Sequence, residues 1–369
     1  MQETMNELKI GDLTIRKPII QGGMGIGISL SRLAAAVANE GGAGIISAVC
    51  IGMTEPDYKT NLKEANKRAL RKEIRKARAL TNGVIGVNIM MAVSDYDDLF
   101  RIALEEKVDL IIIGAGLPLR RPAGIDEEMF KNRKTKIIPK ISSARAANVI
   151  MKFWSEKHGT LPDAFVLEGP LAGGHLGFKP DEIDREDKTL ETLVPETKAV
   201  IRSFEVKYKK SIPLIAGGGI YTGDDIYHIT QLGADGVKMG TRFVTTYECD
   251  AALAFKQTYL DSKQEDIQII ESPVGLPGRV IANQFVREIN SGMQKPVRCA
   301  WQCLKGCKFK SVKFCIADAL FSAARGDFDN GFSFAGSNAW KAERIMSVHE
   351  TFQQLEEEYQ QKCIRRAAV

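Results

Sequence analysis

One histidine lies in a segment that is unusually rich in glycine. The stretch LEGPLAGGHLGF spans residues 167–178, and His175 directly follows Gly173 and Gly174. Glycine weakens strands and helices, and it is kept mainly where the backbone must approach another group closely. An imidazole can give or take a proton near neutral pH, so His175 is a candidate general acid or base. The alternative is a structural histidine whose ring is satisfied by buried backbone groups.

Four further glycine-rich segments follow apolar runs along the chain. They are QGGMGIG (21–27), GAG (114–116), AGGGI (216–220) and MGT (239–241). One such segment is usually a tight turn, but several at the ends of strands favour a phosphorylated cofactor, because backbone N–H groups can hold phosphate there. Neither G-x-G-x-x-G nor G-x-x-x-x-G-K-[ST] occurs, which disfavours a Rossmann dinucleotide site and a P-loop. Flavin mononucleotide (FMN) fits best, because it has one phosphate, a flat ring that the backbone can approach, and no adenine half.

A second group of residues that could do chemistry is a cluster of four cysteines. The segment CAWQCLKGCKFKSVKFC holds Cys299, Cys303, Cys307 and Cys315. The first three are spaced by four residues, so on a helix they would share one face. Four thiolates could bind zinc or an iron–sulfur cluster if the chain breaks at Gly306 and folds the ligands inward. The spacing matches no standard site, and the alternative is that small buried thiols pack this segment against the rest of the protein.

The elements that must position these residues follow a regular rhythm. Near-continuous apolar runs, typical of strands buried on both faces, alternate with longer segments of helical periodicity. The eight candidate strands are KPIIQGG, GAGIISAV, GVIGVNIMM, VDLIIIGAG, TKIIPKIS, DAFVLEG, IPLIAGGGI and ADGVKMGTRFV. This alternation predicts an α/β protein with a (β/α)₈ TIM barrel, whose active site lies at the C-terminal ends of the strands. Between the first two strands, Ser29 is the expected N-cap of a helix.

We expect residues 1–248 to form the barrel that binds FMN. After residue 248 the strand pattern stops, so residues 249–369 are predicted to form a smaller, mainly helical region that contains the cysteine segment and packs on the barrel. Residues 179–196 are charged and flanked by proline, which predicts a surface loop or lid. Residues 62–80 form a basic helix, which we expect to face solvent; the alternative is a docking face for an acidic partner such as a carrier protein.

Composition excludes several classes of protein. A chain of 369 residues with 44% hydrophobic and 26% charged residues can bury a sizeable core. A formal net charge of +5 does not indicate a nucleic-acid-binding protein. No apolar run is long enough to span a membrane, and the N-terminal segment lacks the apolar stretch of a signal peptide. Seven cysteines without an export signal predict reduced thiols and a cytoplasmic location.

The motifs PIIQGGMG, GVNIM, EGPLAGGHLG, IAGGGI and GADGVKMGTRF, in this order and spacing, resemble those of the nitronate monooxygenases, formerly called 2-nitropropane dioxygenases. The same superfamily includes the flavin-dependent enoyl-acyl-carrier-protein reductases. The resemblance implies a barrel that holds FMN non-covalently and a catalytic role for His175. Two features depart from the family pattern. Leu171 stands where members often have an acid, so the acid's contribution to substrate choice or cation binding is not carried over to this chain. The cysteine-rich segment from Cys299 on lies outside the family's motifs.

The resemblance also assigns the cofactor contacts by position. The flavin ring would be lined by Gly22, Gly23 and Met24, its pyrimidine edge would be hydrogen-bonded by Asn88, and Glu168 would lie near the ring or the ribityl chain. The phosphate would be cradled by Gly218, Gly219, Gly240 and Thr241, and Gly173, Gly174 and Gly217 belong to the same predicted site. A side chain at Gly219 is expected to occupy the approach of the phosphate.

Two activities follow from the resemblance. A nitronate monooxygenase would oxidise alkyl nitronates or nitroalkanes with O₂ to carbonyl compounds and nitrite, while His175 binds the nitro oxygens or takes the α-proton. A reductase would use NAD(P)H to reduce FMN and pass hydride to an enoyl thioester, with an acyl carrier protein as partner and His175 as the group that stabilises or protonates the enolate. We expect the first, because QGGMGIGISLSRLAAAVA is more similar to that branch. A flavin-binding protein without turnover, in which His175 is idle, is a third interpretation.

Overall fold

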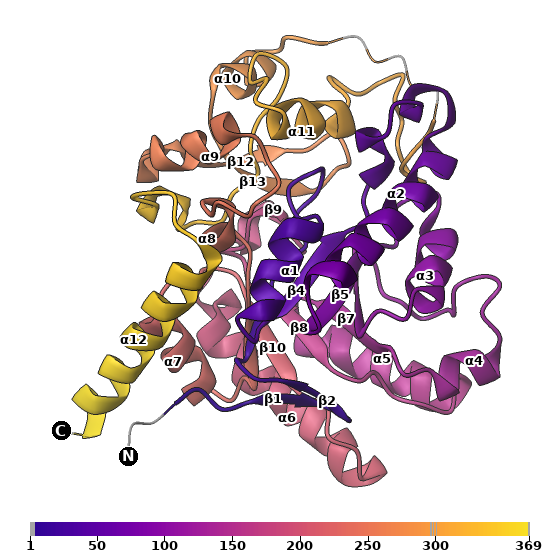
Figure 1. Cartoon of the computed structure of the whole chain (residues 1–369), viewed down its shortest axis with the longest axis vertical. Coiled ribbons are helices and arrows are strands. Elements are labelled where there is room, and N and C mark those ends of the chain that lie inside the picture. The colour runs from indigo at the N-terminus through magenta and orange to yellow at the C-terminus, as the bar shows by residue number, and fades with distance from the viewer. Residues whose placement is uncertain (1–3, 296, 298, 300, 368–369) are drawn as a thin grey trace.

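Eight parallel strands form a closed barrel at the centre of the molecule (Figure 1). The structure is a computed structural model that describes residues 4–295, 297, 299 and 301–367. The barrel strands are β3 (Ile19–Gln21), β4 (Ala43–Ser47), β5 (Val84–Met90), β6 (Leu110–Gly114), β7 (Lys136–Ile141), β8 (Phe165–Glu168), β10 (Leu214–Gly217) and β11 (Gly236–Met239). All eight candidate strands are present, so the predicted (β/α)₈ barrel is confirmed. The eighth strand is shorter than its apolar run, because residues Thr241–Val244 form the short helix α8.

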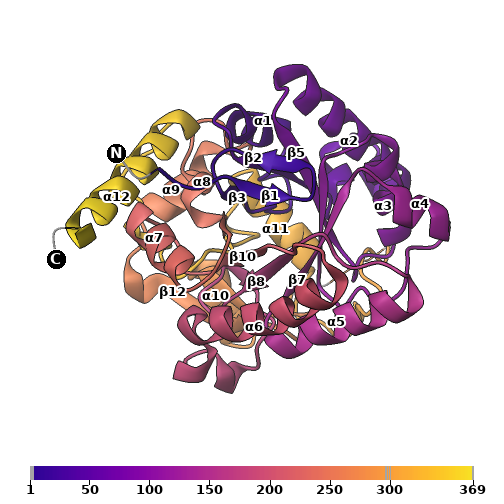
Figure 2. The same ribbon diagram turned by 90° about the horizontal axis from the view of Figure 1, so that it is seen from below.

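Helices surround the barrel, and the last of them comes from the far end of the chain (Figure 2). The helices that follow the first seven strands are α1 (Ser31–Asn39), α2 (Tyr58–Leu80), α3 (Tyr96–Glu105), α4 (Glu127–Asn132), α5 (Ala144–Lys157), α6 (Leu190–Tyr208) and α7 (Gly223–Gln231). Helix α12 (Val348–Ala367) packs beside α7 and α1, in the place of the eighth barrel helix. Its Phe352 and Leu355 are fully buried in the same apolar cluster as the other barrel helices. The expected boundary at residue 248 stays a prediction, and α12 contributes to the barrel from beyond it.

The interior of the barrel is apolar at its N-terminal end. Inward-facing aliphatic side chains from six strands meet there: Ile20, Ile45, Ile112, Ile138, Val166 and Ile215. An antiparallel hairpin of β1 (Leu8–Ile10) and β2 (Leu13–Ile15) lies across this end (Figure 2). Its Leu8, Ile10 and Ile15 are at most 1% exposed and belong to the same cluster. The hairpin, which the sequence analysis did not predict, therefore seals the barrel.

The region after residue 248 is mainly helical, as predicted, but it also contains two strands that the sequence analysis did not predict. Its helices are α9 (Leu253–Leu260), α10 (Gln284–Asn290) and α11 (Ile316–Ala324). Between α9 and α10, β12 (Ile267–Glu271) and β13 (Pro277–Ile281) form an antiparallel hairpin, and β13 also pairs with β9 (Gly174–His175). The strands were missed because β12 is largely exposed and β13 begins with Pro277–Gly278, a pair typical of turns.

The predicted lid at residues 179–196 is only partly a loop. Residues 180–182 and 186–188 form single 3₁₀ turns, and α6 begins at Leu190 and continues through Pro195. Proline inside a helix removes one backbone hydrogen bond. The burial of Leu193 and Val194 against the barrel outweighs that cost, so the prediction is wrong for residues 190–196.

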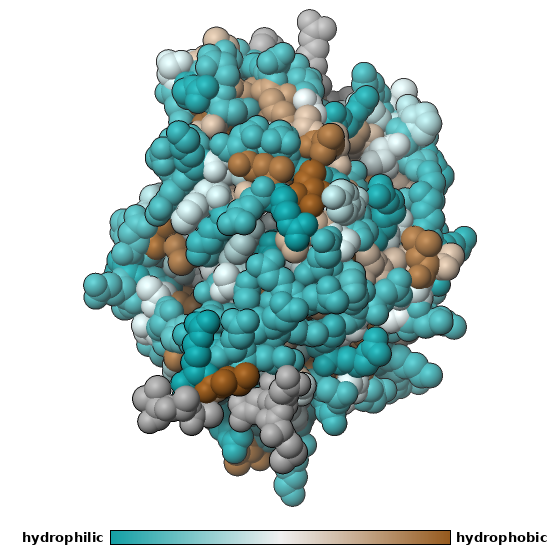
Figure 3. All heavy atoms as spheres, turned by 60° about the vertical axis from the view of Figure 1, so that its left-hand side comes forward, coloured by the Kyte–Doolittle hydropathy of each residue, from teal (hydrophilic) through white to brown (hydrophobic). Residues whose placement is uncertain are grey.

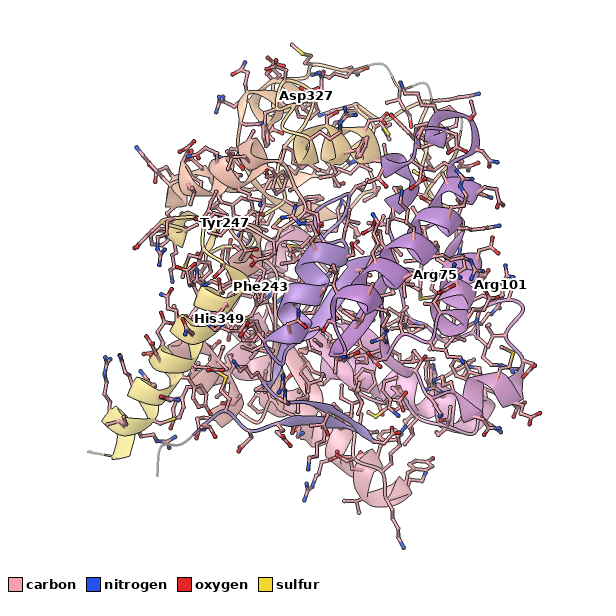
Figure 4. All side chains as sticks on the ribbon, in the orientation of Figure 1. Arg75, Arg101, Phe243, Tyr247, Asp327 and His349 are labelled. Atoms are coloured by element: carbon pink, nitrogen blue, oxygen red, sulfur yellow. The ribbon has the colours of Figure 1, made fainter. Side chains whose placement is uncertain are left out.

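The basic helix α2 lies on the outside of the barrel beside α3, where Figure 4 labels Arg75 and Arg101. Arg71 pairs with Glu105, the last residue of α3, and with Glu106, which follows it; Arg75 also pairs with Glu106. Five further basic residues of α2 have acidic partners: Lys67, Arg68, Lys72, Lys76 and Arg78. Most of the positive charge of this helix is therefore balanced within the chain, which favours the solvent-facing interpretation.

The face that carries α12 is mostly hydrophilic, with small separate apolar patches (Figure 3). Within the described residues, no helix is both long enough and apolar enough to cross a membrane.

Candidate active site

The last inward-facing positions of several barrel strands are polar. Side chains alternate along a strand, so a residue two positions after a buried interior residue faces the same interior. By this rule Ser47 follows Ile45, Lys140 follows Ile138 and Glu168 follows Val166. Register places Asn88 of β5 beside Ser47, and Lys238 of β11 next to Gly217, which is itself beside Glu168. A polar layer thus ends the barrel where the active site of this fold is expected.

Two lysines contact one buried carboxylate in this layer. The Nζ of Lys140 is 2.7 Å from Oε2 of Glu168, and the Nζ of Lys238 is 3.8 Å from Oε1. Burial alone would raise the pKa of Glu168, but the two ammonium groups hold it below its usual value. Burial lowers the pKa of Lys238. With both lysines protonated, the trio carries one net positive charge, which suits an anionic ligand.

Of these three residues, only Glu168 was predicted from the sequence, and Lys140 and Lys238 were not. The signal was present, because each lysine interrupts an apolar strand at an inward-facing position, two residues after Ile138 and Gly236 respectively. A buried charge at such a position is unusual unless it has a partner or a ligand.

His175 is held by residues from the region after the barrel. It lies opposite Gly278 in the pairing of β9 with β13. Its Nε2 is 2.7 Å from the Oγ of Ser272, and its ring meets Phe334 edge-to-face, with ring centroids 4.9 Å apart. The sequence analysis missed Ser272 and Phe334, because they are remote along the chain and no local motif marks them. Together the two contacts fix the plane of the imidazole.

The imidazole of His175 is neutral near pH 7. Burial and, as the smaller cause, the positive charge of Lys140 together lower its pKa to about 4. A neutral imidazole has one donor nitrogen and one acceptor nitrogen, so it can still accept a proton. The site therefore holds a candidate base at neutral pH.

The loop after β3, residues 22–29, is braced by two buried side chains. The Oε1 of Gln21 accepts the N–H of Ile45 at 2.9 Å, and its Nε2 donates to the Oγ of Ser29 at 2.8 Å. The Ser29 hydroxyl donates to the carbonyl of Gly22 at 3.1 Å and accepts the N–H of Met24 at 3.0 Å. These bonds hold in place the loop that is predicted to line the flavin ring.

The prediction that Ser29 is a helix N-cap is wrong, because its hydroxyl is used in this loop. Helix α1 begins at Ser31, and the carboxylate of Asp250 accepts the N–H groups of Leu30 and Leu33 instead. The cap comes from a residue far along the chain, which local sequence patterns do not show.

The residues assigned to the flavin ring lie together. A Cβ added at Gly23 would be 2.5 Å from the Cβ of Asn88, and one added at Gly22 would be 3.0 Å from the Cα of Gly240. The thioether of Met24 is also close to Gly240. The structure thus brings residues from β5, β11 and the loop after β3 to one place, and their contact with a flavin stays a prediction.

The residues assigned to the phosphate lie at the ends of two neighbouring strands. Gly217 ends β10, Gly218 and Gly219 follow it with φ angles of 102° and 83°, and Gly240 and Thr241 follow β11. Glycine is favoured at such positive φ angles. A Cβ at Gly219 would, however, meet the side chain of Leu171 at 3.0 Å. The nearest atoms to such a Cβ thus belong to Leu171, and the expectation that it would occupy the approach of the phosphate stays a prediction.

The glycines before His175 have a structural role of the same kind. A Cβ at Gly173 would lie 2.5 Å from the backbone of Ala335, and Gly174 has a φ of 78° in front of the Phe334 ring. Gly173 and Gly174 are therefore explained, at least in part, by the close packing of loops at the mouth of the barrel.

The residues at the mouth of the barrel fit FMN. The Oγ of Ser47 is buried and has no hydrogen-bond partner within the described part of the chain. Buried hydroxyl groups in proteins nearly always have a partner, so this one indicates a ligand with polar atoms. Ser47 lies beside Asn88, in the same layer as the positively charged Lys140 and Lys238. A flavin has the polar ring edge, and its phosphate the negative charge, that these groups would satisfy.

The four cysteines of the predicted metal site do not lie on a helix. Residues 301–315 form turns and irregular backbone between α10 and α11, and Cys299 lies between two residues outside the described part. No three His, Cys, Asp or Glu side chains gather as metal ligands in the ranges that the structure describes. Metal binding at Cys299, Cys303, Cys307 and Cys315 stays a prediction, which elemental analysis of anaerobically purified protein tests.

Two of these cysteines pack with a buried cysteine of the barrel. Cys303 and Cys315 lie against the apolar cluster that contains Cys50, in the loop after β4. A hydrogen bond between the Cys50 and Cys303 thiols raises the pKa of Cys50 and lowers that of Cys303. This arrangement favours the packing role of the cysteine segment.

The closed barrel, with a candidate base at the C-terminal ends of its strands, has the architecture of a TIM-barrel enzyme. The family model for nitronate monooxygenases matches residues 6–358, so the chain belongs to the nitronate monooxygenase family. A probable nitronate monooxygenase of Staphylococcus aureus (strain Newman) is 31% identical over 75% of this chain and 79% of that protein. Another from Staphylococcus saprophyticus is 28% identical over 76% of this chain and 79% of its own length.

Solved structures show the same fold. FabK from Thermotoga maritima is 27% identical, with a TM-score of 0.72, over 95% of this chain and 96% of that one. The nitroalkane oxidase from Streptomyces ansochromogenes is 22% identical, with a TM-score of 0.69, over 95% and 97% of the two chains. Membership of this family supports a flavin cofactor.

Proposed function

We propose that this protein is an FMN-dependent nitronate monooxygenase that oxidises alkyl nitronates, and nitroalkanes after deprotonation, with O₂. The observation that carries the proposal is the neutral imidazole of His175 near Lys140, at the end of the barrel where the family binds its substrate. Overall, two nitronate anions and one O₂ give two carbonyl compounds and two nitrite ions, which balances atoms and charge.

FMN, when bound, supplies electron transfer to and from the substrate and oxygen. The chain supplies the binding groups: the backbone of the 22–24 loop and the Asn88 amide for the ring, and the turns at Gly218–Gly219 and Gly240–Thr241 for the phosphate. The positive charge of the Lys140, Lys238 and Glu168 trio favours negative charge on the bound groups.

His175 supports the use of neutral nitroalkanes as well as nitronates. An imidazole with a pKa near 4 is unprotonated at pH 7, so it can take the α-proton of a nitroalkane. Lys140 stabilises the nitronate anion that results, because it adds positive charge close to the imidazole. Ser272 and Phe334 hold the imidazole in one orientation, so no reorganisation is needed at the moment of proton transfer.

Anaerobic stopped-flow reduction of the bound flavin tests the proposal. We expect rapid bleaching by ethyl nitronate and slow bleaching by NADH or NADPH, followed by reoxidation with O₂ and release of nitrite. Fast bleaching by NAD(P)H and reoxidation by an enoyl thioester would instead identify the reductase. A flavin that neither reductant bleaches would identify a binding protein without turnover, and protein that binds no flavin would contradict the cofactor itself.

A further inference from the structure

A short segment from the region after the barrel crosses the predicted phosphate site. We call residues Phe334–Asn338 the strap. The N–H of Gly336 donates to the Oγ1 of Thr241 at 2.9 Å, and the Nδ2 of Asn338 donates to the carbonyl of Gly219 at 2.7 Å. The strap is therefore bonded to both turns that the sequence analysis assigned to the phosphate.

The strap also contacts the loop that carries His175. The N–H of Ser337 donates to the carbonyl of Leu171 at 3.1 Å. A Cβ at Gly173 would lie 2.6 Å from the nitrogen of Gly336, so this glycine lets the two backbones touch. Ser337 therefore lies between Gly336, which is bonded to Thr241, and Asn338, which is bonded to Gly219. Three loops of the barrel mouth thus fix its position.

The hydroxyl of Ser337 is the unexplained group in this arrangement. Its Oγ is buried and has no hydrogen-bond partner in the part of the chain that the structure describes. Leaving a buried polar group unsatisfied is unfavourable, so such a group is rarely kept without a reason. A hydroxyl can donate to a phosphate oxygen, and the adjacent turns offer the backbone N–H groups that bind the same anion.

We infer that Ser337 is a ligand of the cofactor's phosphate, and that the strap completes a phosphate site which the barrel alone leaves open. The inference rests on the proposed binding of FMN. It adds a residue from outside the barrel to the cofactor site, so the region after residue 248 takes part in binding the cofactor as well as in holding His175.

Comparing FMN with riboflavin isolates the phosphate contact. Flavin-free protein is titrated with each ligand, and binding is followed by the change in flavin fluorescence. A hydrogen bond to a charged group contributes about 1.5–3 kcal/mol, so Ser337→Ala should raise the Kd for FMN about 10- to 100-fold at about 1.4 kcal/mol per tenfold. It should leave the Kd for riboflavin unchanged, and Ser337→Thr, which keeps the hydroxyl, should restore FMN binding.

Ser333→Ala is the matched control. Ser333 lies just before the strap and is 1% exposed, but its hydroxyl is bonded to that of Thr258 at 3.1 Å, away from the phosphate turns. This variant should leave both Kd values unchanged. Thermal unfolding of each variant shows that it is folded, and Ser337→Gly provides a second variant without the hydroxyl.

The possible results separate this inference from the proposed cofactor. If the wild type binds FMN and the Ser337 variants bind it equally well, the inference is overturned and the cofactor stands. If these variants lose FMN and riboflavin to the same extent, Ser337 acts on the ring or the fold, and the inference is again overturned. If the wild type binds neither flavin, the proposed cofactor and this inference both fail.

Discussion

At one end of the barrel, the interior is closed by Leu8, Ile10 and Ile15 of a hairpin that packs on aliphatic strand residues. At the other end, the same strands finish in a polar layer, with Lys140 and Glu168 as an ion pair. The closed end loses nothing by being apolar and gains the free energy of burial. The open end keeps buried charges and an unsatisfied hydroxyl, which a stable barrel alone does not need. This difference assigns stability to one end and chemistry to the other.

The largest effect is expected from replacing His175, which should lower activity at the open end without changing stability. His175→Ala removes the candidate base, so kcat/KM for a neutral nitroalkane should fall about 10²- to 10⁴-fold. The loss on a preformed nitronate should be smaller, because its α-proton is already gone. Flavin content and melting temperature should stay the same, and the exposed His228 provides the control variant His228→Ala. Full activity on the nitroalkane would return His175 to a structural role.

A cavity at the closed end should have the opposite effect, lowering stability and leaving activity and flavin binding unchanged. Ile15→Ala removes fully buried methyl groups and should lower the free energy of unfolding by about 2–5 kcal/mol, with flavin affinity and kcat unchanged for the folded protein. Ile269→Ala, at an exposed position of β12, should change the free energy of unfolding by less than about 0.5 kcal/mol. Chemical denaturation and flavin titration measure the two quantities. A loss of flavin affinity in Ile15→Ala would show that the two ends are coupled.

Gly219→Ala should have an intermediate effect at the open end. An alanine at a φ of 83° costs about 1–3 kcal/mol, and its methyl group also meets Leu171. FMN binding should weaken, because the turn must shift. In a Leu171→Ala background the steric part of the loss should disappear while the backbone part remains. An unchanged FMN Kd in Gly219→Ala would remove this turn from the phosphate site.

His175 should also make the free energy of unfolding depend on pH. The pKa of His175 is about 4 in the fold, against about 6.5 in an unfolded chain. The stability from the neutral imidazole is therefore complete above pH 6.5 and is lost as the pH falls from 6.5 toward 4. In the flavin-free protein, wild type should lose more stability than His175→Ala over this interval. An NMR titration of His175 with a midpoint near 6.5 would contradict the buried, neutral imidazole.

Much of this architecture could be predicted from the sequence. The eight apolar runs and the glycines at their ends marked the barrel and its active end, and His175 stood out in its glycine-rich segment. These features are local, because a strand or a tight turn is specified by neighbouring residues. Lys140 and Lys238 could also have been predicted as site residues from their inward-facing positions in the strands, but they were not recognised.

The partners of these residues could not be predicted in the same way. Ser272 and Phe334 reach His175 from distant segments, Ser337 lies in a strap bonded to the turns after β10 and β11, and Asp250 caps α1 from 220 positions beyond Leu30. Such contacts depend on how whole elements pack, so no periodicity or spacing near either partner reveals them. The spacing of four residues between the cysteines was misleading for a related reason. It places side chains on one face only in a helix, and residues 301–315 do not form a helix.

The position of α12 also constrains the order in which the chain can fold. The helix fills the gap between α1 and α7, where Lys17 pairs with Glu356 and Phe352 packs against Gly42. These contacts join residues more than 300 positions apart in sequence, and such contacts form slowly because a long loop must close first. During synthesis, α1 and the first strands leave the ribosome long before residues 348–367. The ring of helices therefore stays open between α1 and α7 until α12 packs, and the apolar surface that Phe352 and Leu355 bury is exposed until then.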